Sequence, residues 1–128
     1  MKVENSSTID NAVTARLADI TAKSGRIEQA LKNISLEHEL LNATYHFGQA
    51  QEGNAFTSCL SAITLARDLG RSSVVHSVLD MMEKQINKMD GVFVSDIQRL
   101  SIFLTHLDGV NPIQIARLTE ALRKVRKL

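Results

Sequence analysis

The chain has 128 residues, of which 44% are hydrophobic and 23% are charged, a composition that excludes disordered and fibrous proteins. This length suits one domain, and because aromatic residues make up only 4% the core must be built from aliphatic side chains, which favours helices. The net charge of +1 excludes a chain that is strongly basic or acidic throughout.

The first predicted helix is long and carries an apolar residue at every seventh position. It covers residues 8–47, starts at a sequence similar to a capping box, and has a possible break at 24–25, where a serine precedes a glycine. We expect residues 1–7, which precede it, to be disordered. A polar, glycine-containing loop, FGQAQEGN, follows the helix.

Four shorter helices are predicted in the rest of the chain, separated by short loops. Asn54, Ser95 and Asn111 are suitable N-caps, and Pro112 suits a first helical turn because its missing N–H is not needed there. Only the stretch GVFVS alternates in the way that a strand does. The predicted helices cover residues 54–69, 73–89, 95–107 and 112–127. The predicted fold class is therefore all-α, with a long N-terminal helix or helical hairpin packed with a short-loop helical bundle, in a single helical domain over residues 8–128.

The seven-residue repeat of the first helix predicts an apolar seam. Five residues, most of them β-branched, recur every seven positions, and each is followed four residues later by a second position of the same stripe. Polar Ser24 and His38 interrupt this second series. The seam residues are Val13, Leu17, Ile20, Ile27, Leu31, Ile34 and Leu41. An apolar stripe on a helix needs a partner, which is either the other helices of the same chain or a second copy or client protein.

Residue patterns typical of enzymes and metal sites are missing. Each glycine stands alone, and no histidine has the spacing of a di-iron or metalloprotease ligand set. His76 and Asp80 lie one helical turn apart and could share a proton or a metal, but a hydrogen bond on a solvated helix surface is the simpler interpretation. Cys59 occupies an apolar helix position with no feature that would activate its thiol. We therefore expect no enzymatic activity, no cofactor and no metal.

The compartment is indicated by the start of the chain and by its cysteine content. The opening stretch, MKVENSSTID, is polar, and no apolar segment of signal-peptide length follows it. Eighteen apolar residues never occur in succession, so we expect no membrane-spanning helix. A single cysteine excludes an internal disulfide and supplies too few thiolates for structural zinc. The expected location is the reducing cytoplasm.

The stretch GVNPIQIARL, residues 109–118, resembles the turn and second helix of helix-turn-helix DNA-binding proteins. Gly109 corresponds to the turn glycine, and Ile115 and Leu118 to the packing residues of the recognition helix. The resemblance implies contact with DNA. It is limited to about twenty residues, and Ile113 and Ala116, at positions that would face bases, offer no hydrogen bonds.

Charge is concentrated near the C-terminus, where residues 91–128 carry six basic and three acidic side chains. Cations near a helix C-terminus are favoured by the helix dipole, which is a sufficient structural reason for them. They could also hold phosphates without reading sequence. The candidate phosphate-contacting residues are Arg117, Arg123, Lys124, Arg126 and Lys127.

Two functions from different classes follow from these patterns. The seam favours a non-enzymatic protein–protein interaction module, such as an assembly factor, adaptor or chaperone-like subunit, that binds a partner helix or another copy of itself. The alternative is a DNA-binding accessory or regulatory protein that uses the C-terminal helices and the basic tail. Contact of the same basic helix with an acidic membrane is less favoured, because its apolar face lacks aromatic side chains.

Overall fold

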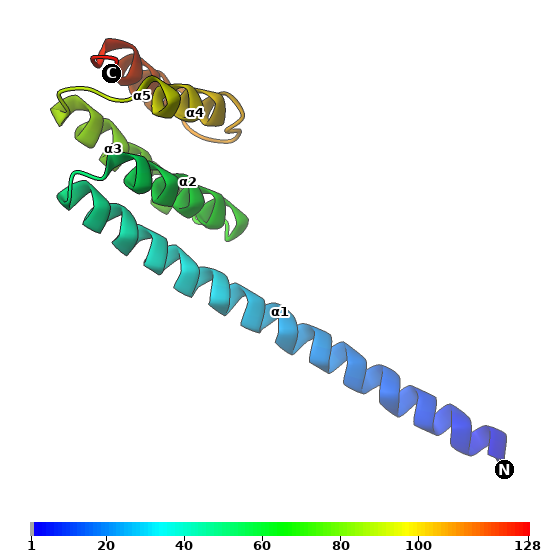
Figure 1. Cartoon of the computed structure of the whole chain (residues 1–128). Helices are drawn as coiled ribbons and strands as arrows, with labels where there is room; N and C mark the ends of the chain where they lie inside the picture. The colour runs from blue at the N-terminus through cyan, green and yellow to red at the C-terminus, as the bar shows by residue number, and fades with distance from the viewer. Residues whose placement is uncertain (1) are drawn as a thin grey trace. The chain divides into compact units, whose positions relative to one another are not determined.

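The computed structural model describes residues 2–128, with side chains from Ile9 onward, and within this range the chain forms five α-helices and no β-strand. The helices are α1 (Lys2–Gly48), α2 (Glu52–Asp68), α3 (Ser72–Lys88), α4 (Val94–Thr105) and α5 (Pro112–Lys124) (Figure 1). The predicted all-α class, with a long N-terminal helix followed by helices on short loops, is confirmed.

The chain divides into two compact units, an N-terminal unit of residues 1–32 and a C-terminal unit of residues 33–128. The physical reason lies in the N-terminal unit, where every residue from Ile9 to Leu31 is exposed, so that this part of α1 adds nothing to the buried core.

Helix α1 differs in two ways from its prediction. It begins at Lys2, so residues 2–7, which were predicted to be disordered, are helical, and it continues without a break through 24–25. A glycine inside a helix costs about 1 kcal/mol relative to alanine. Two ion pairs of i,i+4 spacing lie on either side of Gly25. Asp19 pairs with Lys23 at 2.9 Å, and Glu28 pairs with Lys32 at 3.7 Å. Each contributes about 0.2–0.5 kcal/mol, so together they offset part of that cost.

The C-terminal unit is built from the end of α1 and the four shorter helices. Helix α3 packs against both α2 and α5, and α4 contacts α5 and α2 (Figure 1). Leu36 and Ala43 bring α1 into the same core. The largest fully buried side chains are Phe56, Leu36, Ile63, Leu79, Met82, Ile86, Leu100, Leu118, Leu122, Val78 and Cys59. The core is therefore largely aliphatic, as the composition predicts.

Of the three caps predicted at Asn54, Ser95 and Asn111, one forms as expected, whereas the side chains at the predicted start of the first helix lie outside the described residues. The Asn111 side chain accepts a hydrogen bond from the backbone N–H of Ile113 at 3.0 Å, and Pro112 occupies the first turn of α5. Helix α2 starts two residues before Asn54, and Ser95 lies inside α4. Packing of the helix faces, which contributes more than a single cap, sets these two starting points.

The C-terminal end of the chain leaves the helix earlier than predicted. Helix α5 stops at Lys124, and Val125 adopts an extended conformation instead of continuing the helix to residue 127. The backbone N–H of Val92 donates to the carbonyl of Arg126 at 2.9 Å, and the N–H of Leu128 donates to the carbonyl of Val92 at 3.0 Å. The strand-like alternation of GVFVS thus corresponds to one parallel β-bridge, between Val92 and Lys127. Among the described residues, no helix combines the length and apolarity that crossing a membrane requires.

Candidate protein-binding surface on the long helix

The seven seam residues are all exposed on α1. In the N-terminal unit Val13 is 49% exposed and Ile27 is 60% exposed, and in the C-terminal unit Leu41 is 70% exposed. The other seam residues, Leu17, Ile20, Leu31 and Ile34, are exposed to a similar extent. Ile9 and Tyr45, also exposed, extend the apolar stripe at its two ends. The described side chains of α1 therefore present an apolar surface to solvent.

A different face of α1 packs into the core of the C-terminal unit. Leu36 and Ala43 are completely buried, and Leu40 is packed against the same core. At about 100° per residue Leu36 and Ala43 lie roughly 140–180° around the helix from Ile34 and Leu41, and Leu40 lies roughly 100–120° from them. The seam in this unit consequently faces away from α2–α5, so packing against the chain's own helices does not cover it.

Two contacts hold this end of α1 against the rest of the C-terminal unit, and a third closes the turn that follows the helix. Phe47 meets Phe56 of α2 edge to face, with ring centroids 5.7 Å apart. Arg71 donates a hydrogen bond from Nη1 to the Asn33 side-chain oxygen at 3.2 Å. His46 donates from Nδ1 to the side-chain oxygen of Gln51 at 2.7 Å, just after the helix ends. Ile34 and Leu41 lie roughly 120–140° around the helix from Phe47 and roughly 80–100° from Asn33, so these contacts hold the two seam residues away from the core.

Arg117 of α5, one of the candidate phosphate-contacting residues, is paired with acidic residues of α3. Its guanidinium lies 3.2 Å from the Asp80 carboxylate and 3.4 Å from the Glu83 carboxylate. Exposed ion pairs contribute little to stability, about 0–1 kcal/mol, so these contacts do not lock the side chain. They do neutralise its charge at the surface.

Two more of these basic residues gather around Glu120. The Arg123 guanidinium lies 2.5 Å from its carboxylate and the Lys124 ammonium 3.7 Å from it. The hydrogen bond from Arg123 and the two positive charges lower the pKa of Glu120 to about 2, and the same contact raises the pKa of Arg123. Arg126 and Lys127 are exposed in the extended tail and form no ion pair with any residue that the structure describes. The basic residues of α5 thus face an equal number of carboxylates.

The region that resembles a helix-turn-helix has the turn of that family, but the exposed face of α5 is not suited to contacting bases. Gly109 has a φ of +74°, which fits the proposed turn glycine, and Leu118 is fully buried. The open side of α5 carries Ile113, which is 69% exposed, together with Ala116 and the paired Arg117. Apolar and charge-neutralised side chains give few donors for base edges or phosphates.

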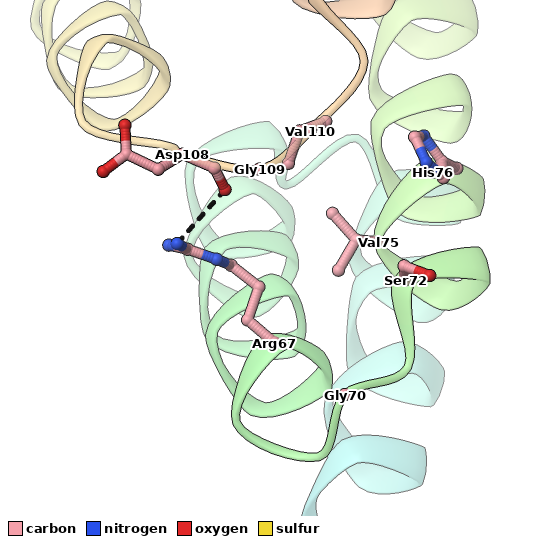
Figure 2. Close-up of a pocket in the computed structure, with 8 residues that line it drawn as sticks. All are labelled: Arg67, Gly70, Ser72, Val75, His76, Asp108, Gly109 and Val110. Atoms are coloured by element: carbon pink, nitrogen blue, oxygen red, sulfur yellow. Dashed lines mark hydrogen bonds between the residues drawn. The ribbon is translucent and has the colours of Figure 1, made fainter.

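A small cavity of about 170 Å³ lies between α2, α3 and the loop before α5 (Figure 2). Figure 2 shows Arg67 reaching toward this loop, where it donates to the backbone carbonyl of Asp108 at 3.2 Å while the Asp108 carboxylate points away. Val75 and Val110 contribute apolar walls. Typical ligand pockets measure about 300–1,000 Å³, so this space is a packing gap bridged by one arginine.

His76 and Asp80 are joined through Gln114, a residue that the sequence patterns did not single out. Gln114 is 6% exposed, and its side-chain amide donates to the His76 carbonyl at 2.7 Å and to the Asp80 carboxylate at 3.0 Å. Its oxygen accepts a hydrogen bond from His76 Nδ1. The pair therefore satisfies a buried amide between α3 and α5 instead of forming a hydrogen bond on a solvated surface. Within the described residues no three potential ligands gather as a metal site would require.

Cys59 is expected to be unreactive in the folded protein. It is completely buried in α2, and burial raises the pKa of its thiol to about 12, so the thiol stays protonated at neutral and mildly alkaline pH. A thiol-reactive chromophore added at mildly alkaline pH should label the native chain only at the rate at which the core opens, and should label it at once in denaturant. Rapid stoichiometric labelling without denaturant would contradict this burial.

Comparison of the chain with models of protein families, with curated proteins and with solved structures finds no match. The assignment of function therefore depends on the two surfaces that the structure presents. The seam is apolar and exposed, whereas three of the five candidate phosphate-contacting residues are paired with carboxylates of the same chain.

Proposed function

We propose that this chain is a non-enzymatic protein–protein interaction module, an assembly factor, adaptor or chaperone-like subunit, whose seam binds a partner helix or another copy of itself. The observation that carries the proposal is the exposure of all seven seam residues on a helix whose opposite face packs the core of the C-terminal unit. Large contiguous apolar patches are rare on soluble monomers and mark interaction sites.

The energetics of the N-terminal unit support the same proposal. Single helices are marginal in water, because most helix stability in proteins comes from packing an amphipathic face. The ion pairs of Asp19 with Lys23 and of Glu28 with Lys32 lie within α1. The hydrogen bond from the Thr14 hydroxyl to the Asp10 carbonyl also lies within α1. Burying one seam side chain against a partner stabilises the complex by about 1.5–3 kcal/mol, which is several times the stabilisation that one such ion pair gives a helix. A partner helix is thus the source of stability that this unit lacks.

Nothing in this role calls for catalysis. The buried, protonated thiol of Cys59 and the hydrogen bond from His76 to Gln114 are both explained by packing within the fold. A free buried thiol is compatible with a reducing cytoplasm. DNA binding is less favoured, because the charge of α5 is balanced by Asp80, Glu83 and Glu120.

The proposal is tested with two aspartate substitutions on the same helix. Ile27→Asp places a charge in the seam, and Ala22→Asp places the same charge on the opposite side of α1, where it serves as the control. The tagged full chain is used to capture partners from the cells that make it, with and without nuclease. We expect partners, including untagged copies, to be retained by the wild type and by Ala22→Asp, and to fall roughly tenfold or more with Ile27→Asp.

Retention that is equal for both variants would contradict the proposed function. Partners that disappear after nuclease treatment would contradict it as well, and would transfer the role to the basic C-terminal residues.

A further inference from the structure

We infer that the seam is covered by further copies of this same chain, with their α1 helices parallel and in register in a coiled coil of three or four helices. This inference rests on the proposed function and names its partner. It follows from the spacing of the seam, from its polar interruptions and from the charges beside it.

The spacing of the seam assigns each residue to a heptad position. Four residues separate Val13 from Leu17, and three separate Leu17 from Ile20. In a coiled coil the step from a to d is three residues and the step from d to the next a is four, so Leu17 and Leu31 occupy a positions. The d positions are Val13, Ile20, Ile27, Ile34 and Leu41. Leucine at a with isoleucine at d favours three or four helices over two.

The polar interruptions select the register. Ser24 and His38 both fall at a positions and are exposed on α1. In a parallel, in-register assembly each meets the same residue of the neighbouring copies, so polar groups share a layer and can bond to one another or to water. A shift by one heptad would place His38 against Leu31, and an antiparallel arrangement would place it against one of the apolar residues at the d positions. Polar a-position residues are the best-attested devices that fix register.

The charges beside the seam are compatible with the parallel arrangement. Lys23 lies at a g position and Glu28 at the following e position, which face each other between neighbouring parallel helices. Both are exposed, and their partners within the helix leave them accessible, since the side chains of Lys23 and Glu28 are 62% and 71% exposed. The other charged g residues, Arg16 and Glu37, would face uncharged e positions. These g–e pairs bring no like charges together, whereas the carboxylates of Asp10, at the a position one heptad before Leu17, would meet near the N-terminal end of the seam.

The size of the seam is sufficient for a stable assembly. The seven seam residues with Ile9 and Tyr45 each offer on the order of 100 Å² of apolar surface, which adds up to roughly the 800 Å² that each partner contributes to a standard interface. In the C-terminal unit the core lies on the opposite side of α1 from Ile34 and Leu41, so it does not block the approach of other copies along that stretch.

The first test is the mass of the purified full chain in solution, measured by sedimentation equilibrium over a range of concentrations. We expect three or four chains for the wild type and for Ala22→Asp. Ile27→Asp should raise the dissociation constant roughly 100-fold or more, because every copy loses a buried isoleucine and buries a carboxylate. Circular dichroism of the variants checks that α2–α5 remain folded.

The second test is the orientation of the helices, measured with His38→Cys and a short bifunctional thiol reagent. Parallel, in-register helices bring the new thiols of adjacent copies together, whereas antiparallel helices separate them by more than about 20 Å. The wild type, whose Cys59 is buried, and Ala22→Cys, which points away from the seam, are the controls. We expect cross-linked oligomers from His38→Cys alone.

The outcomes distinguish this inference from the proposed function. A wild-type chain that stays monomeric overturns self-association, while Ile27-dependent capture of another protein from cells would leave the proposed function intact. A monomer without such capture overturns both. A dimer, or a His38→Cys chain that does not cross-link, overturns the parallel assembly of three or four helices.

Discussion

Phe56→Ala is expected to lower the free energy of unfolding of the C-terminal unit by about 3–5 kcal/mol, the cost of removing a buried aromatic ring. Phe56 is completely buried in α2 and meets Phe47 of α1 edge to face. Its loss removes core volume and also one of the contacts that hold α1 to this unit. Urea denaturation followed by circular dichroism measures the change.

Phe93→Ala is the matched control, because it removes the same ring from a position that is 63% exposed. A surface substitution of this kind should change stability by no more than about 0.5 kcal/mol. A double-mutant cycle of Phe56 with Phe47 should give a coupling of about 0.5–1.5 kcal/mol, as expected for an edge-to-face pair. Equal effects at Phe56 and Phe93 would show that the core is not packed as described.

Gly91→Val is expected to displace the C-terminal segment and to destabilise the C-terminal unit by about 1–3 kcal/mol, in the range of overpacked substitutions. A Cβ atom at Gly91 would lie 2.7 Å from Leu128 Cγ and 3.1 Å from the carbonyl oxygen of Arg126. Both atoms belong to the segment that pairs with Val92. Hydrogen exchange at the amides of Val92 and Leu128 should therefore accelerate.

Gly48→Val provides the comparison for this prediction, because nothing lies within 4 Å of a Cβ built at Gly48. It should leave exchange at Val92 unchanged. Protection at Val92 that survives Gly91→Val would mean that the tail tolerates the added atoms, and would contradict the close approach.

The sequence was sufficient to predict the helical class and the start of α5. The heptad spacing of α1 and the pair Asn111–Pro112 are local signals, and the structure contains the helix and the cap that they indicate. Exposure of the seam could not be predicted, because the same spacing fits packing within the chain. That choice depends on which face of α1 meets Phe56, a contact between separate helices.

The errors have related causes. A break at 24–25 was predicted from local propensity, yet a single glycine costs only about 1 kcal/mol and the surrounding helix tolerates it. The end of α5 depends on pairing between Val92 and Arg126, which are far apart in sequence. Gln114 gave no signal, because a glutamine on a helix is ordinary until His76 and Asp80 are placed beside it. Tertiary neighbours decided each of these features.

The two opposite faces of α1 between residues 33 and 48 separate two kinds of mutational effect. A change at Leu36 or Ala43 should alter the melting temperature at every protein concentration, because it acts on the interior of one chain. A change at Ile34 or Leu41 should instead alter how melting depends on concentration. Substitutions on the exposed face of this helix could therefore change which partner binds, while the residues on the buried face keep the fold unchanged.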